Sequence, residues 1–224
     1  VRETGWTKQD WIFRHLHDFD DEKQRLLKQY GKSRVVLYAP TFSPKLTSLP
    51  YLKPALEQLC AQRDILLILK FHPLTAKEWA DEYREWASDR NDAIYIEASE
   101  NVTRYQMMSD VMISDTSSSV YEFLLLDRPV VTFRTIAKDI YWENIDDPDQ
   151  LTDAFDRALN DPDAAVKRHW IVDNYDPHMD GMCCQRMIAE AQDYIDRHGV
   201  PSKRRLNLWR KYTSIKTFGK IKRD

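Results

Sequence analysis

The chain has 224 residues, of which 42% are hydrophobic and 31% charged, with a formal net charge of −3. This length suits one large or two small domains, and no apolar run approaches the ~20 residues that cross a bilayer. The polar start does not resemble a signal peptide, and the three cysteines have neither the number nor the spacing of a disulfide framework or a zinc site. The composition therefore predicts a soluble chain from a reducing compartment.

The order of apolar and polar segments predicts strands that alternate with helices. A polar, helix-compatible lead over 8–30 ends at Gly31. Strand-like apolar runs follow at 35–38, 65–69, 94–96, 111–113 and 130–133. Helix-compatible segments lie at 54–62, 75–88, 104–108, 149–160 and 182–197, and a further helix follows residues 115–118 and ends at 126. About five strands, each followed by a helix or a crossover-length loop, predict an α/β fold with a doubly wound parallel sheet.

In such a sheet the loops that follow the strands open at one edge, where α/β proteins bind ligands. These loops carry Thr41, His72, residues 97–101, residues 115–118 and Thr135. The sequence therefore predicts that these five segments gather at the carboxyl edge of the sheet.

The loop at 115–118 is rich in hydroxyl groups. Asp115, Thr116, Ser117 and Ser118 are all residues that cap helix N-termini, and the free N–H groups of a following helix attract phosphate. We interpret this loop as a phosphate-binding segment. The alternative is a polar helix cap with additional serines.

His72 stands between a buried strand and Pro73, which restricts its movement. Together with Lys70, it can supply a cation or a proton to a phosphate oxygen. The alternative is a structural histidine that bonds a backbone carbonyl at the strand end.

Common cofactor and metal signatures are absent from the sequence. There is no G-x-G-x-x-G, Walker GKS/GKT or G-x-S-x-G motif, and only five glycines are present. The histidine spacings match no recognised metal pattern. We therefore predict no metal and no cofactor.

The C-terminal residues 201–224 form a basic tail, and we predict a domain boundary between 1–200 and this tail. The tail carries nine basic residues and one acid, or +8, so that residues 1–200 carry −11. Apolar residues such as Leu208, Trp209 and Phe218 alternate with these charges, which is typical of segments that lie on anionic membranes. Nucleic acid would attract the same charge, but we predict no nucleic-acid partner. The alternative is a helix that packs on the protein with a solvated basic face.

Six short motifs stand in order between residues 4 and 190. They are Thr4-Gly5 with Asp10, Tyr38-Ala39-Pro40-Thr41, Lys70-Phe71-His72-Pro73, Ser114-Asp115-Thr116-Ser117-Ser118 with Glu122, Arg128-Pro129-Val130-Val131, and Asp180-Gly181 with Arg186. Their order resembles the C-terminal half of the CDP-glycerol glycerophosphotransferases, the teichoic-acid and capsule polymerases of GT-B architecture.

This resemblance implies a Rossmann-like, C-terminal GT-B half that binds a CDP-activated polyol. It implies that His72, Ser117 and Ser118 contact the pyrophosphate, with His72 the candidate catalytic residue. Thr41 would lie nearby, and Glu122 would bind the ribose or the glycerol. The further candidates for substrate binding are Lys70, Asp115, Thr116, Asp180, Gly181 and Arg186.

The resemblance also implies a lipid-linked or capsular polymer as the acceptor, at the cytoplasmic face of the membrane. In the family, an N-terminal domain binds the acceptor and supplies a general base, and we expect that domain to lie outside these 224 residues. Thr116 and Ser119 depart from the usual aromatic and apolar residues of the family. The segment between Phe133 and Asp149 is also shorter than the resemblance leads us to expect, so glycerol, ribitol and a sugar stay open as the transferred unit.

Two other functions stay open on sequence grounds. A GT-B glycosyltransferase or a hydrolysing sugar-nucleotide 2-epimerase would also place histidine and hydroxyl groups around a nucleotide diphosphate, with a preference for uridine. A non-catalytic domain would instead use its basic tail to bind a membrane or a partner protein.

Overall fold

The structure is a computed structural model that describes residues 2–200 and 206–219. Its contacts divide the chain into a unit from Glu3 to Cys184 and a second unit with Arg2 and the residues from Gln185 onward. The predicted boundary at residue 200 stays a prediction, and the tail residues 201–205 and 220–224 lie outside the described residues. Within the described ranges, no helix has the length and apolarity needed to span a membrane.

The first unit contains a six-stranded sheet in the order β3-β2-β1-β4-β5-β6, and all its neighbouring pairs are parallel. The doubly wound α/β prediction is therefore confirmed. The strands are β1 (Arg34–Tyr38), β2 (Ile65–Lys70), β3 (Ala93–Ile96), β4 (Val111–Ser114), β5 (Val130–Phe133) and β6 (Glu143–Ile145). The sequence did not predict β6. This strand has three residues, and Ile145 is the one among them that is apolar and buried.

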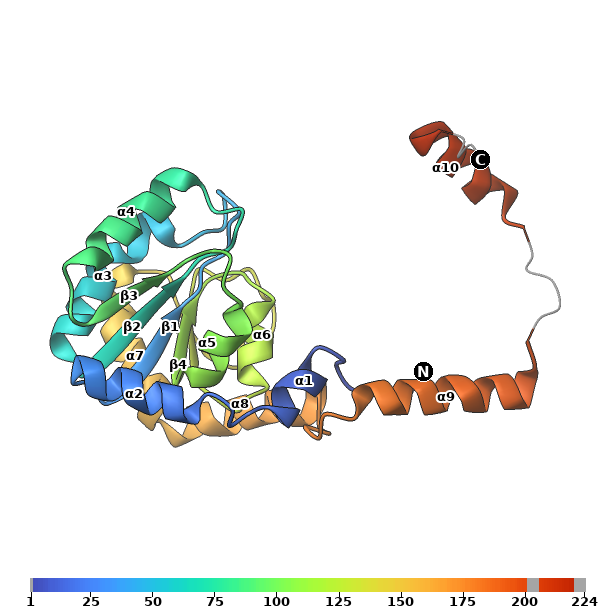
Figure 1. Ribbon diagram of the computed structural model, residues 1–224, viewed down its shortest axis with the longest axis horizontal. Coiled ribbons are helices and arrows are strands. Elements are labelled where there is room, and N and C mark those ends of the chain that lie inside the picture. Colours follow the sequence, from blue (N-terminus) through green and yellow to red (C-terminus); the bar gives the residue numbers. More distant parts are fainter. Residues whose placement is uncertain (1, 201–205, 220–224) are drawn as a thin grey trace. The chain divides into compact units, whose positions relative to one another are not determined.

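The helices of the first unit pack on both faces of this sheet (Figure 1). They are α1 (Gln9–Arg14), α2 (Asp20–Tyr30), α3 (Leu49–Gln62), α4 (Lys77–Ser88), α5 (Val102–Met108), α6 (Ser119–Leu124), α7 (Leu151–Asn160) and α8 (Pro162–Tyr175), with a 3₁₀ turn, η1 (Pro148–Gln150). α9 (Cys183–His198) begins at the end of this unit, and α10 (Leu208–Phe218) lies in the second unit.

Three helix predictions need correction. The polar lead forms two helices, α1 and α2, instead of one. α3 begins at Leu49 because the N–H groups of Tyr51 and Leu52 already bond the Ser48 carbonyl, so Pro54 lies inside the helix. α8 was not predicted, since its apolar residues follow no clear helical stripe, but Asp161 caps it by accepting a bond from the Asp163 N–H at 2.9 Å.

The sheet is buried on both faces. In β1, Val36 and Tyr38 belong to the core beneath α3, α4 and α7, whereas Val35 and Leu37 belong to the core beneath α2, α5 and α6. Burial of such aliphatic side chains contributes about 1.5–3 kcal/mol each. The strands are therefore fixed in register, and their carboxyl ends meet at one edge.

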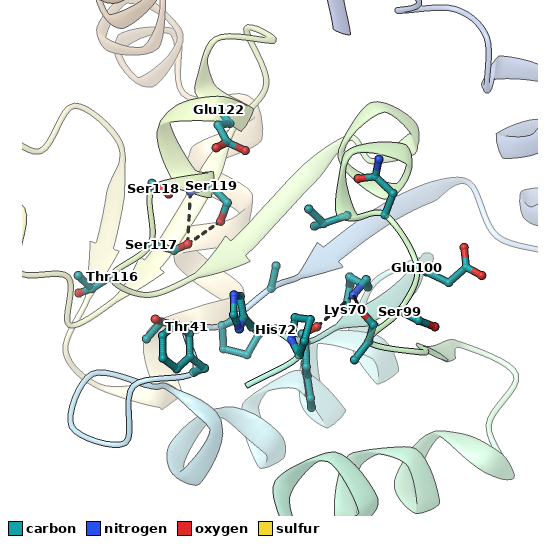
Figure 2. Close-up of a pocket in the computed structure, with 18 of the residues that line it drawn as sticks. Thr41, Lys70, His72, Ser99, Glu100, Thr116, Ser117, Ser118, Ser119 and Glu122 are labelled. Carbon is teal, nitrogen blue, oxygen red and sulfur yellow. Dashed lines mark hydrogen bonds between the residues drawn. The ribbon is translucent and has the colours of Figure 1, made fainter. Parts of the chain in front are cut away.

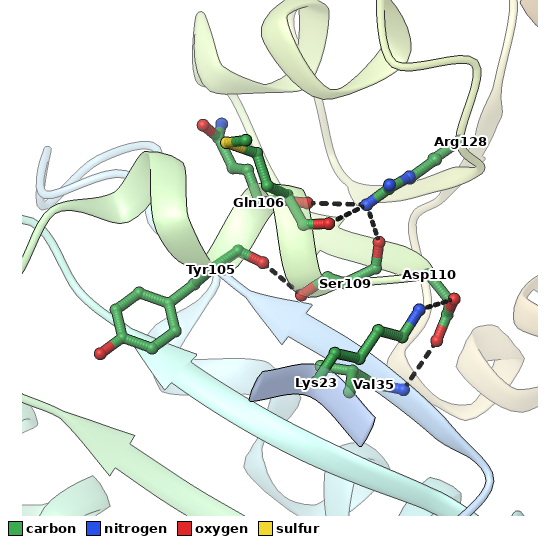
Figure 3. A network of polar contacts seen from close by, with 8 residues as sticks. Lys23, Val35, Tyr105, Gln106, Ser109, Asp110 and Arg128 are labelled. Carbon is green, nitrogen blue, oxygen red and sulfur yellow. Dashed lines mark hydrogen bonds and ion pairs between the residues drawn. The ribbon is translucent and has the colours of Figure 1, made fainter. Parts of the chain in front are cut away.

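A polar network fixes the start of β4 (Figure 3). The Arg128 guanidinium donates hydrogen bonds to the carbonyls of Gln106, Met107 and Ser109 at 3.1, 2.6 and 2.7 Å. The Asp110 carboxylate pairs with Lys23 and accepts a bond from the Val35 N–H at 2.9 Å. These contacts satisfy the C-terminal carbonyls of α5 and join β4 to β1.

A second set of contacts joins α1 to the segment before α9. The Asp10 carboxylate accepts bonds from the N–H groups of Cys183 and Cys184, both at 2.8 Å, and Arg14 donates to the Gly181 carbonyl at 2.8 Å. Gly181 has a φ of +68°, and a Cβ there would lie 2.9 Å from the Asp10 carbonyl oxygen. Glycine is therefore required at this position. We call this set the Asp10–Gly181 contact.

We predict that Asp10→Asn lowers the free energy of unfolding by about 1–2 kcal/mol, because Asp10 caps α9. Burial raises the pKa of Asp10, but the N–H groups of Cys184 and Cys183 outweigh that effect and lower the pKa below 3.8. A lowered folded-state pKa gives stability that is present above the unfolded value and is lost as the pH falls through the folded one.

Urea unfolding at several pH values tests this prediction. The difference between the wild type and Asp10→Asn should be full at pH 6 and should narrow below pH 3.8. Asp139→Asn, at an exposed position, is the matched control. A difference that does not change with pH would contradict the proposed role of the charge.

Candidate functional site

A cavity of about 640 Å³ opens at the carboxyl edge of the sheet (Figure 2). Its lining comes from the loops after β1, β2, β3 and β4, together with Lys8 and Glu122. The predicted gathering of these loops is therefore confirmed for four of the five. The fifth loop, which carries Thr135, lines a smaller cavity of about 290 Å³ that shares Thr116, Ser117 and Ser118 with the first.

His72 is held in the cavity by its backbone and by an aromatic neighbour. Its Nδ1 accepts a hydrogen bond from the Leu74 N–H at 3.1 Å, and its ring stacks on Phe42 with centroids 4.5 Å apart. A neutral imidazole that accepts at Nδ1 carries its proton on Nε2. The structure thus differs from the carbonyl-bonded alternative and leaves Nε2–H as a donor. Phe42 was not among the predicted site residues, although it follows Thr41.

Lys70 is buried in the same cavity, where its ammonium donates to the carbonyls of Phe71 at 3.0 Å and Ala98 at 3.2 Å. These bonds connect the end of β2 to the loop after β3. Burial lowers the pKa of Lys70, although Glu100 and Glu97 act in the opposite direction. Lys70 therefore has a structural role, and its predicted contact with the substrate stays a prediction.

Asp115 was predicted to bind the substrate, but its side chain is fully buried and does not line the cavity. Its two oxygens accept bonds from the Thr41 N–H at 2.9 Å and from both the N–H and the hydroxyl of Ser48 at 2.8 Å. Burial raises the pKa of Asp115, and these bonds partly offset that effect. Asp115 is thus placed to position the Thr41 loop against the end of β4.

The hydroxyl loop after β4 fits the helix-cap alternative only in part. α6 has only six residues, and the Ser118 side chain at its N-cap makes no capping bond, whereas the Ser119 N–H donates to the Ser117 hydroxyl at 3.3 Å. Instead, the Ser117 and Ser119 hydroxyl oxygens lie 2.7 Å apart, and the Thr116 hydroxyl accepts a bond from the Ile136 N–H at 3.1 Å. The hydroxyl groups themselves, and not a helix end, are what this loop offers to a ligand.

Glu122 occupies the edge of the cavity beside Lys8. Its side chain is buried, its Oε1 lies 2.6 Å from the Lys8 ammonium, and its backbone carbonyl accepts a bond from Gln9 Nε2 at 3.2 Å. Its Oε2 is buried and has no hydrogen-bond partner among the described residues. Lys8 was missed because it is 114 positions from Glu122 in the chain.

The late motif is not part of this cavity. Asp180 accepts a bond from the Met182 N–H at 3.0 Å, and Gly181 belongs to the Asp10–Gly181 contact. Neither residue lines the cavity, so their prediction as direct substrate ligands is not supported by the geometry. Arg186 lies in the second unit, and its predicted role stays a prediction.

The profile of the family described as CDP-Glycerol:Poly(glycerophosphate) glycerophosphotransferase matches residues 1–190. The chain belongs to this family. A teichoic acid poly(glycerol phosphate) polymerase of Bacillus spizizenii is 26% identical over 58% of the chain and 34% of its own length. The teichoic acid ribitol-phosphate polymerase TarK of Staphylococcus aureus is 23% identical over 84% of the chain and 39% of its own length. The chain thus spans well under half of these relatives.

Solved structures confirm the GT-B type of fold. The wall teichoic acid polymerase TagF has a TM-score of 0.62 at 19% identity, over 88% of this chain and 53% of that one. A putative UDP-N-acetylglucosamine 2-epimerase from Listeria monocytogenes has a TM-score of 0.57 at 14% identity, over 81% and 51%. At these identities the likeness concerns the fold, whereas the family match separates this chain from the epimerase alternative.

Proposed function

We propose that this domain binds the CDP-activated alcohol that serves as the donor in a glycerophosphotransferase reaction. The observation that carries this proposal is the cavity itself, which brings an imidazole donor, a hydroxyl loop and a buried carboxylate to one edge of the sheet. Its volume of about 640 Å³ lies in the usual range for small-molecule sites. Family membership supports the class of donor.

In this proposal the pyrophosphate lies between the loop after β2 and the loop after β4. His72 donates from Nε2–H to a phosphate oxygen, while the hydroxyls of Ser117 and Ser118 donate from the other side. Phe42 and the Leu74 N–H hold the imidazole in place, so little reorganisation is needed when the donor binds.

The reaction is an in-line transfer of a polyol phosphate. An acceptor hydroxyl oxygen forms a bond to the β-phosphorus, the bond from that phosphorus to the bridging oxygen breaks, and CMP leaves with the electron pair. The acceptor proton passes to a general base. We propose that this base and the acceptor polymer site lie on a part of the enzyme outside these 224 residues, because the chain spans only 34% to 39% of its relatives.

We further propose that the basic tail binds the anionic face of the cytoplasmic membrane, where a lipid-linked acceptor would lie. In α10, Leu208, Tyr212, Ile215 and Phe218 share one face of the helix, and all are exposed. Lys216 borders that face beside Tyr212, and Lys211 lies within it between Ile215 and Phe218. Exposed apolar side chains with cations beside them are typical of helices that lie in a lipid interface.

The first prediction of this proposal concerns the phosphate contacts. His72→Ala, and separately the double change Ser117→Ala/Ser118→Ala, should weaken binding of CDP-glycerol by about 10- to 150-fold, equivalent to about 1.5–3 kcal/mol for a lost charge-assisted contact. Isothermal titration calorimetry measures the affinity, with His17→Ala and Ser88→Ala as controls at exposed positions. Unchanged affinity in a folded variant would remove these residues from the site. Tighter binding of UDP than of CDP would favour a uridine-dependent enzyme.

The second prediction concerns catalysis by the isolated chain. The 224-residue protein should bind CDP-glycerol but release no CMP in the presence of a glycerol-phosphate acceptor, because base and acceptor site are proposed to lie elsewhere. Chromatographic detection of CMP provides the measurement. Acceptor-dependent release of CMP by this chain alone would contradict the division of labour between two domains.

The third prediction concerns the tail. The intact chain should sediment with vesicles that contain phosphatidylglycerol but not with neutral phosphatidylcholine vesicles, and added salt should release it. A version that ends at Pro201 should stay in the supernatant, and Lys211→Gln/Lys216→Gln should bind more weakly. If the truncated and intact versions sediment equally, the tail is a structural helix and does not bind membranes.

A further inference from the structure

The carboxylate of Glu122 has one oxygen that the described residues leave unused. The residue is 4% exposed, and Oε2 is buried without a hydrogen-bond partner among the described residues. Glu122 lines the cavity, but Oε2 itself has no exposed surface, so a bound molecule meets this oxygen only when the carboxylate turns as the ligand binds. An ionised carboxylate only accepts hydrogen bonds, so its natural ligand is a hydroxyl or an amine.

The other oxygen of this carboxylate is held by Lys8. The Lys8 ammonium lies 2.6 Å from Oε1, and its side chain is 48% exposed whereas that of Glu122 is 5% exposed. A buried carboxylate without a cation would be costly. Lys8 therefore offsets the cost of burying this charge and holds one of its two oxygens.

Lys8 is itself fixed by the protein around it. The neighbouring Gln9 is fully buried and bonds the Glu122 carbonyl from its amide nitrogen, and Asp10 anchors the same turn to the start of α9. The segment that carries Lys8 thus has little freedom to move away. Its ammonium would leave a buried charge unpaired if it turned toward a phosphate instead.

We propose that Lys8 is a positioning residue for the donor: it holds Glu122 by Oε1 so that Oε2 accepts a hydrogen bond from a vicinal diol of the ligand. This inference rests on the proposed function and extends it. Both the ribose of CDP and the glycerol of CDP-glycerol carry such a diol, and the chemistry of recognition is the same for the two.

Calorimetric titration with four nucleotides separates the two diols. CDP and 2′-deoxy-CDP differ in the ribose hydroxyl, whereas CDP-glycerol and the propyl ester of CDP differ in the diol of the alcohol without a change of charge. We expect the wild type to prefer the diol-bearing member of one pair by about tenfold, the value for one hydrogen bond to a charged group.

Variants then test the role of Lys8. Lys8→Met should reduce that preference to about twofold or less, whereas Lys8→Arg should retain most of it. Glu122→Gln should also lose the preference, and the double variant should bind no more weakly than Glu122→Gln alone, because the two residues act through one contact. Lys28→Met, at an exposed position on α2 outside the cavity, is the control and should behave as the wild type.

The outcomes distinguish this inference from the function on which it rests. Failure of the wild type to bind any of the four nucleotides would remove the proposed function. Binding without a preference in either pair, or a preference that survives in Lys8→Met, would overturn the role of Lys8. If Lys8→Met does not fold, Lys8→Gln retains a polar side chain of similar length, and the preference should still fall at least threefold.

Discussion

The buried carboxylate of Asp115 joins the two strands between which the winding of the sheet reverses. β1 pairs with β2 on one side and with β4 on the other, so the loops after β1 and β4 part from each other at this point. Asp115, at the end of β4, binds the N–H of Thr41 and both the N–H and the hydroxyl of Ser48 across that gap. A buried carboxylate is tolerated only with such donors. Together with the Ser114 hydroxyl, which donates to the Ala39 carbonyl at 2.7 Å, this carboxylate fixes the spacing between the two sides of the cavity.

The cavity has the chemistry of an anion site without a glycine-rich loop. Five glycines occur in the chain, and α6 is too short to supply a strong helix dipole. In the proposed function, hydroxyl groups after β4 and the Nε2–H of His72 supply the donors instead, and His72 and Ser117 are each held by a neighbouring contact. Side-chain donors of this kind depend on the packing around them, which explains why Phe42 and Asp115 lie directly behind the groups that would meet a ligand.

The N-terminal segment makes a second set of contacts beside the cavity. Asp10 and Arg14 hold the segment before α9, and the same turn presents Lys8 to Glu122. The fold therefore explains the glycine of the Asp180-Gly181 motif: α1 lies so close to Gly181 that there is no space for a side chain. Residues about 170 positions apart thus meet next to the segment that carries Lys8 into the cavity, which is one physical reason for family motifs that lie outside it.

The sequence by itself determined the α/β class, the strands β1 to β5, and the placement of His72 and the hydroxyl loop at one edge. These features are local: a strand buried on both faces needs an apolar run, and the loop after it needs polar residues. Only the tertiary structure decided that Asp115 is buried behind the cavity and bonds the Thr41 N–H, that the Ser118 side chain caps no helix, and that Lys8 pairs with Glu122. It also supplied β6 and α8, whose weak patterns become stable against neighbours. Each of these features depends on contacts between segments that are distant in the chain. A local sequence pattern does not show which distant groups are buried together.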